Sequence, residues 1–167
     1  LIDGNRRFVD GRPEHPRQDA ERRRETLECQ RPFAVVLTCS DSRLSPEILF
    51  DQGIGDLFVI RDAGNVLDDI VEGTIEYAVE HLHASLVVVL GHSRCGAVTA
   101  AVQSPDDGGK GGAVVRVLQP AVISARNLPG DTVLNAAIAN VRLSVARLQG
   151  EPASTLPDSE PGSPRVV

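Results

Sequence analysis

The sequence comprises 167 residues with a mass of 17.8 kDa, a net charge of −6 and a pI near 5.2. This length suits one globular domain, and the acidic balance argues against nucleic acid or an anionic membrane as a partner. No apolar run approaches the roughly 20 residues that span a bilayer, and no signal-peptide pattern opens the chain. Only three cysteines predict a reducing, cytoplasmic location. Because the sequence has no methionine, Leu1 is not a translation start, and the chain is expected to be trimmed or a fragment.

The elements expected along the chain alternate between helices and strands. Short apolar, β-branched runs predict three strands, at 33–38, 57–61 and 86–90. Helical periodicity and capping residues predict helices before, between and after them, at 1–10, 20–28, 45–52, 68–83, 96–103, 114–127 and 131–148. Strands this apolar, alternating with helices, predict an α/β fold in which a parallel sheet is flanked by helices.

The segment 151–167 differs from the rest of the chain in composition. It is rich in Pro and Ser and has no periodicity that indicates a helix or a strand. We therefore expect a domain over residues 1–150, followed by a tail that is disordered or that replaces the usual end of the domain. Val166 and Val167 are too few to predict a strand, so the expected sheet has three strands and an unpaired edge on the third.

Two polar segments follow the first and third predicted strands. Cys39 comes at the end of the first strand, and His92 and Cys95 follow the third. Ligands of α/β proteins collect at the carboxyl ends of strands, so these three side chains can meet at one point if the two strands are neighbours. Two thiolates and one imidazole suit Zn²⁺, and three protein ligands with an open fourth position are typical of a catalytic zinc site. The start of a helix at Cys95 also favours its thiolate.

Asp41 and Arg43 lie in the same segment as Cys39. Zinc held by two thiolates is formally neutral and polarises water less strongly than zinc held by three imidazoles, so another group must help to hold hydroxide. Asp41 can accept a hydrogen bond from that hydroxide, or it can occupy the fourth zinc position and close the site. The guanidinium of Arg43, paired with Asp41, keeps the carboxylate ionised and oriented.

Two other features are less specific. The turn at 62–65 either lines the cleft or simply ends the second strand, and Cys29 is expected to be a plain, partly buried thiol.

The pattern Cys-x-Asp-x-Arg at 39–43, followed about 50 residues later by His-x-x-Cys at 92–95, resembles the β-class carbonic anhydrases. The segments around 4–8, 55–61 and 91–97 agree with this family, and the likeness covers about residues 1–150. It implies a sheet of strand order 2-1-3-4, of which the chain shows 2-1-3 and lacks the usual fourth strand.

The resemblance also implies the site and its reaction. One Zn²⁺ per chain is held by Cys39, His92 and Cys95, and Asp41 and Arg43 form the catalytic dyad. Zinc-bound hydroxide attacks CO₂, which is hydrated reversibly to bicarbonate and a proton. The family further implies a homodimer or a higher homo-oligomer with the cleft at the interface.

The same likeness implies two substrate contacts, at Gln52 and Gly96. Gln52 is similar to a glutamine that contacts substrate across the interface in some members, and Gly96 is a second expected substrate contact.

Two other functions stay open. The missing strand is compatible with a non-catalytic, zinc-stabilised oligomerisation or binding module, and the same fold and metal suit another linear heteroallene such as CS₂.

Overall fold

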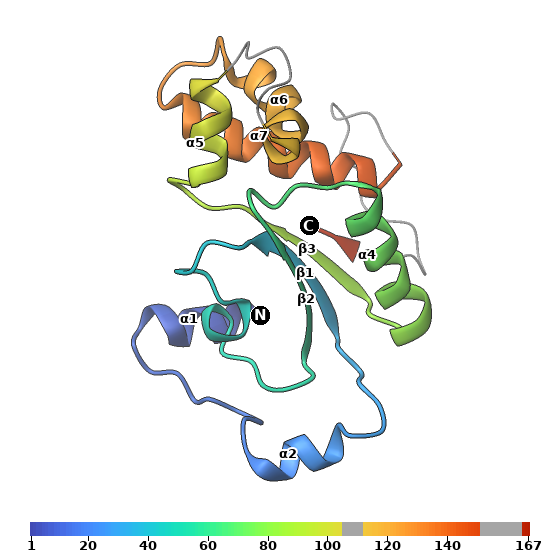
Figure 1. The fold of residues 1–167 in the computed structure, drawn as a ribbon. Coiled ribbons are helices and arrows are strands. Elements are labelled where there is room, and N and C mark those ends of the chain that lie inside the picture. The colour runs from blue at the N-terminus through green and yellow to red at the C-terminus, as the bar shows by residue number, and fades with distance from the viewer. Residues whose placement is uncertain (105–111, 151–164) are drawn as a thin grey trace.

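The computed structural model describes residues 1–104, 112–150 and 165–167 (Figure 1). One parallel sheet has the strand order β2-β1-β3-β4, formed by β1 (Ala34–Cys39), β2 (Leu57–Asp62), β3 (Leu86–Leu90) and β4 (Arg165–Val166). The helices of the described ranges are α1 (Ile2–Val9), α2 (Ala20–Glu25), α3 (Pro46–Leu49), α4 (Asp69–Leu82), α5 (Gly96–Gln103), α6 (Ala113–Ala125) and α7 (Thr132–Leu148). The α/β class and the order 2-1-3 predicted from the sequence are confirmed.

The core forms around β1, every residue of which is buried. Val35 and Leu37 of β1 pack in one cluster with the apolar face of α4, which presents Val71, Ile75 and Ala78. The helix begins where the Asp68 carboxylate accepts the N–H groups of Ile70 and Val71, and it ends at His83 in a left-handed conformation. The period of 3.6 residues predicted for this helix thus places its apolar stripe on the sheet.

A second apolar cluster joins α5, α6 and α7 beside the carboxyl ends of the strands (Figure 1). It includes Cys39 and Cys95 together with Val98 and Leu118. The apolar side chains of α7 are buried only in part. Val141, Val145 and Leu148 pack on the sheet core, whereas Leu134 and Ile138 are 41% and 43% exposed beside a hollow at the end of β3.

The prediction that the fourth strand is missing is wrong. Arg165 and Val166 pair in parallel with Leu86 and Val87, and Val167 exchanges backbone hydrogen bonds of 2.8 and 2.9 Å with Val89 and Val87. Val166 also packs against the sheet core. Two residues carry no periodicity, but an open strand edge supplies their backbone partners, and the edge of β3 is paired there. The rest of the predicted tail, like most of the 104–112 loop, lies outside the described residues.

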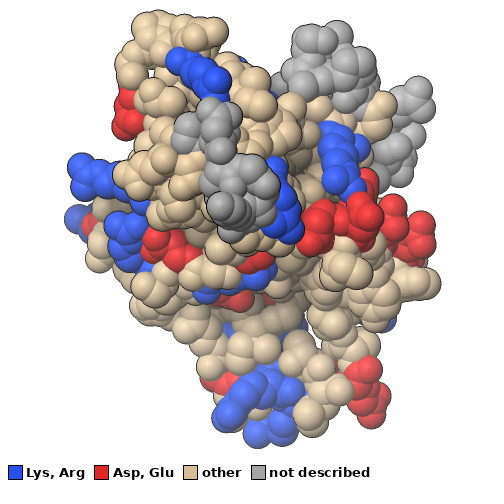
Figure 2. Space-filling model, turned by 45° about the horizontal axis from the view of Figure 1, so that its top comes forward, with Lys and Arg blue, Asp and Glu red and all other residues tan. Residues whose placement is uncertain are grey.

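The N-terminal segment carries α1 and α2 and is tied to the body by carboxylates. Asp51 accepts the Nε–H of Arg7 at 2.6 Å and the backbone N–H groups of Glu14 and His15 at 2.9 Å each. Asp56 accepts from Arg17 in the same way. Figure 2 shows Lys and Arg side chains gathered at the lower end of the molecule, where α2 carries three consecutive arginines.

We expect Asp51→Asn to loosen the segment that Asp51 holds. The Glu14 N–H, followed by the Arg7 guanidinium, lowers the pKa of Asp51 to about 2 against the opposing effect of burial. Because the pKa is lowered on folding, this stabilisation is present above the ordinary value near 4 and is lost as the pH falls through 2. Amide exchange at residues 14 and 15 should rise by more than about tenfold at pH 7, since hydrogen bonds to charged groups are the stronger kind.

The matched control for that measurement is Asp3→Asn. Asp3 forms an exposed pair with Arg6 three residues later, which contributes little in water. Unchanged exchange at residues 14 and 15 in Asp51→Asn would show that the buried carboxylate does not hold the segment.

Candidate metal centre

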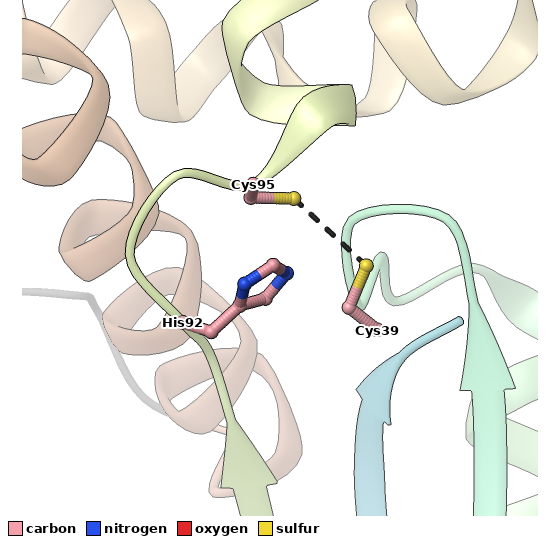
Figure 3. A group of neighbouring side chains, drawn as sticks. All are labelled: Cys39, His92 and Cys95. Carbon is pink, nitrogen blue, oxygen red and sulfur yellow. Dashed lines mark hydrogen bonds between the residues drawn. The ribbon is translucent and has the colours of Figure 1, made fainter. Parts of the chain in front are cut away.

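Three side chains from separate parts of the chain converge at the carboxyl edge of the sheet. Cys39 is the last residue of β1, His92 follows β3, and Cys95 directly precedes α5 (Figure 3). One ligand atom from each lies within 4.8 Å of the other two. Strands β1 and β3 are hydrogen-bonded neighbours, which is the condition under which the sequence predicted this meeting.

The geometry of the three donors fits a zinc ion. The sulfurs of Cys39 and Cys95 are 3.9 Å apart, and two thiolates on a tetrahedral zinc with bonds of about 2.3 Å lie roughly 3.8 Å apart. His92 Nδ1 is 3.0 Å from the Ser93 carbonyl oxygen, which can only accept, so Nδ1 carries the proton. The lone pair then resides on Nε2, which is buried and has no hydrogen-bond partner among the described residues. A histidine held through one nitrogen with the other left free is typical of a metal ligand.

Cys95 lies where burial and a helix start act against each other. Burial raises the pKa of its thiol, whereas the backbone N–H groups of Val98 and Ala97 at the start of α5 act in the opposite direction. A metal that binds here displaces a thiol proton, so its apparent affinity rises with pH.

Asp41 and Arg43 form a bidentate pair beside the three donors. The Arg43 backbone N–H and Nε–H both donate to Asp41 Oδ1, at 3.0 and 2.9 Å, and Nη2 donates to Oδ2 at 2.7 Å. These bonds hold the pKa of the Asp41 carboxyl well below its usual range. Arg61 of β2 fixes the same loop, because it donates to the carbonyl oxygens of Asp41 at 2.8 Å and Cys39 at 3.3 Å.

The turn after β2 contacts the metal centre directly, so it does more than end the second strand. The Gly64 N–H donates to Cys39 Sγ at 3.2 Å. Within the same turn, Asp62 Oδ1 accepts the Val66 N–H at 2.7 Å, and burial raises the pKa of Asp62 to about 6. The sequence signal for this contact was the glycine in the turn at 62–65, which alone did not distinguish a site residue from a strand end.

Three other residues singled out in the sequence lie differently. Gln52 is buried and its amide donates to the carbonyl oxygens of Phe50 and Asp51, at 2.7 and 3.0 Å. Gly96 is the first residue of α5 and stands beside Cys95. Cys29 is exposed, not partly buried as expected, because it lies in the connection between α2 and β1. The substrate contacts predicted for Gln52 and Gly96 stay predictions.

Residues 34–156 match the sequence model of the family described as carbonic anhydrase. The chain belongs to this family. A carbonic anhydrase of Mycolicibacterium smegmatis is 47% identical over 153 residues, which cover 89% of this chain and 74% of that protein. Carbonic anhydrase 2 of Mycobacterium tuberculosis is 53% identical over 116 residues, which cover 70% of this chain and 56% of that protein.

Solved structures place the fold in the β class of carbonic anhydrases. The β-carbonic anhydrase CafA of Aspergillus fumigatus superposes with a TM-score of 0.67 at 28% identity, over 91% of this chain and 75% of that one. A β-carbonic anhydrase of Coccomyxa gives a TM-score of 0.69 at 25% identity, over 92% and 72%. The family expected from the two cysteine-containing motifs is confirmed.

We also searched the helices for a segment that could span a membrane. Across the described ranges, none of the helices combines the length and the apolar character that crossing a bilayer requires.

Proposed function

We propose that the chain is a zinc-dependent carbonic anhydrase, which converts CO₂ and water reversibly into bicarbonate and a proton. The observation that carries this proposal is the convergence of two sulfurs 3.9 Å apart with a buried imidazole nitrogen that has no hydrogen-bond partner in the described part of the chain. We assign one Zn²⁺ per chain to Cys39, His92 and Cys95. When bound there, zinc supplies the Lewis acidity that makes water a nucleophile near neutral pH.

Asp41 serves in this proposal as the acceptor that orients the nucleophile. Its carboxylate stays ionised because Arg43 lowers its pKa, so it would accept a hydrogen bond from the O–H of the nucleophile and orient an oxygen lone pair toward CO₂. Arg43 occupies both oxygens of Asp41. That pairing favours an orienting role over a closed site in which Asp41 is the fourth zinc ligand.

The surroundings of the centre suit an apolar substrate. Cys39 and Cys95 belong to an apolar cluster with Val66, against which Leu44 and Ala97 pack. CO₂ has no net dipole, so it can bind between apolar side chains. Such side chains form no hydrogen bonds with the nucleophile and leave it free to react. Gln52 and Gly96 remain proposed as substrate contacts, and CS₂ shares the linear shape that such walls accept.

The test compares the metal-depleted chain with the same chain reloaded with zinc. We expect one zinc per chain, CO₂ hydration by stopped flow between pH 7 and 9 only after reloading, and loss of turnover when a chelator removes the metal. Retention of zinc without hydration at any of these pH values would overturn the proposal in favour of a non-catalytic zinc-stabilised module. CS₂ hydrolysis measured on the same sample distinguishes the two substrates. The non-catalytic module was considered because the fourth strand was expected to be missing, and the sheet of this structure contains β4.

We also propose a homodimer or a higher homo-oligomer and a cytoplasmic location. Ile2 and Val9 of α1 are 71% and 73% exposed, and Ile48 of the adjoining α3 is 57% exposed. Large apolar side chains gathered on neighbouring helices are commonly covered by another subunit. Sedimentation should show more than one chain per particle, and a monomer at micromolar concentration would contradict this. The free thiols, two of which are assigned to a metal, support a reducing compartment.

A further inference from the structure

Asn140 is a buried polar residue of α7 that lies far from the metal ligands in sequence. It is 5% exposed, and its Nδ2 donates to the carbonyl oxygens of Gly64 at 3.0 Å and Asn65 at 3.3 Å. Burying an amide costs free energy unless its donors find acceptors. These two bonds therefore satisfy Asn140 in the core, and they tie α7 to the turn that follows β2.

The turn that Asn140 holds contains two consecutive residues with positive φ. Gly64 and Asn65 have φ values of +85° and +42°, in a region that residues other than glycine rarely adopt. A Cβ at position 64 would lie 3.1 Å from Ala97 Cβ and 3.1 Å from Leu118 Cδ1. Gly64 adopts this conformation without strain, whereas at Asn65 it costs free energy that neighbouring groups must offset. Asn140 supplies that restraint from α7, on the carbonyl side of the turn.

The restraint is passed to the metal centre through a single residue. Gly64 accepts from Asn140 through its carbonyl oxygen and donates from its N–H to Cys39 Sγ at 3.2 Å. Peptide groups are planar, so only the two backbone dihedrals of Gly64 separate the carbonyl from the N–H. On the other side, the Ser40 N–H donates to the Asp62 carbonyl at 2.7 Å and fixes the end of β2. With both flanks held, the direction of the Gly64 N–H is set.

We propose that Asn140 is a positioning residue for the metal centre, which keeps the Gly64 N–H on the Cys39 sulfur and thereby sets how strongly that sulfur donates to the metal. This inference rests on the proposed function, because it takes Cys39 as a zinc ligand. An N–H donor on a thiolate withdraws electron density from the sulfur, and partners of this kind tune a metal site. In a centre with two thiolates, the withdrawal leaves more positive charge on the metal.

The test substitutes Co²⁺ for zinc and compares the wild type with Asn140→Leu, which has a similar volume and no donor. Without the Gly64 N–H, the Cys39 sulfur is the stronger electron donor, so the sulfur-to-cobalt charge-transfer band should move to lower energy. Zinc affinity, measured against a competing chelator, should nevertheless fall about 10- to 100-fold, because the thiolate loses the hydrogen bond that stabilises its charge and fixes its direction. Asn140→Ser has a side chain too short to reach both carbonyl oxygens and should give the same shift of the band. It replaces the leucine variant in the test if that variant does not fold.

The matched control is Asn135→Leu on the same helix. Asn135 also donates its Nδ2 to a backbone carbonyl, that of Pro129, but it does not touch the turn at 62–65, so its band and zinc affinity should equal those of the wild type. A folded Asn140 variant with the wild-type band and affinity would overturn the inference and leave the proposed function intact. A wild-type chain that binds neither Co²⁺ nor Zn²⁺ would overturn both.

Discussion

Cys39→Ser is expected to abolish CO₂ hydration and to weaken zinc binding by more than about 100-fold. Loss of a partner outside the ligand set already costs 10- to 100-fold, and a serine hydroxyl is a far poorer ligand than a thiolate. Cys39 is 5% exposed at the end of a fully buried strand, and serine is nearly isosteric with it, so the fold should survive. Zinc content per chain and stopped-flow hydration measure the two effects separately.

Cys29→Ser is the control for that substitution. Cys29 is an exposed free thiol outside the proposed centre, and its replacement should leave zinc content and hydration at the wild-type level. If Cys39→Ser kept one tightly bound zinc per chain and wild-type turnover, Cys39 would not be a ligand. Loss in both variants alike would indicate general thiol damage in place of a specific site.

Asp41→Asn is expected to lower kcat/KM for CO₂ by about 10²- to 10⁴-fold, the range typical of losing a positioned acid–base group, while zinc stays bound. The neutral amide pairs less strongly with Arg43 and can present a donor where the carboxylate only accepts. Because Arg43 keeps the pKa of Asp41 far below neutrality, the wild-type carboxylate is ionised throughout the pH range of the assay. No loss of activity from its protonation is therefore expected as the pH falls from 9 to 6.

The control for Asp41→Asn is Asp3→Asn, which removes an exposed carboxylate that pairs with Arg6 in α1. It should leave both zinc content and turnover unchanged. Two results would count against the orienting role. Wild-type turnover in Asp41→Asn would show that the carboxylate is dispensable, and loss of zinc would make Asp41 a metal ligand.

The parts of the fold that the sequence predicted are those with strong local signals. Three apolar, β-branched runs predicted β1, β2 and β3, because buried parallel strands expose neither face to water. The helices predicted at 68–83 and 131–148 both open on an aspartate, and both carboxylates accept backbone N–H groups at the first turn. The approach of Cys39, His92 and Cys95 followed from the rule that strand ends meet at one edge of the sheet.

The parts that the sequence did not predict depend on partners distant along the chain. The two-residue strand β4 exists because β3 offers an open edge, and so short a segment has no periodicity of its own. Asn140 lies within a helix among ordinary neighbours, and its role appears only when α7 packs against the turn some 75 residues earlier. Gly64 could be recognised as a turn residue, but its N–H reaches the Cys39 sulfur only in the assembled fold.

The most direct test of the metal centre is X-ray absorption at the zinc edge of the reloaded wild-type chain. The account predicts two sulfur ligands at about 2.3 Å, one imidazole nitrogen at about 2.0–2.1 Å and one further light atom. A shell with fewer than two sulfurs, or one without imidazole scattering, would contradict the assignment of zinc to Cys39, His92 and Cys95.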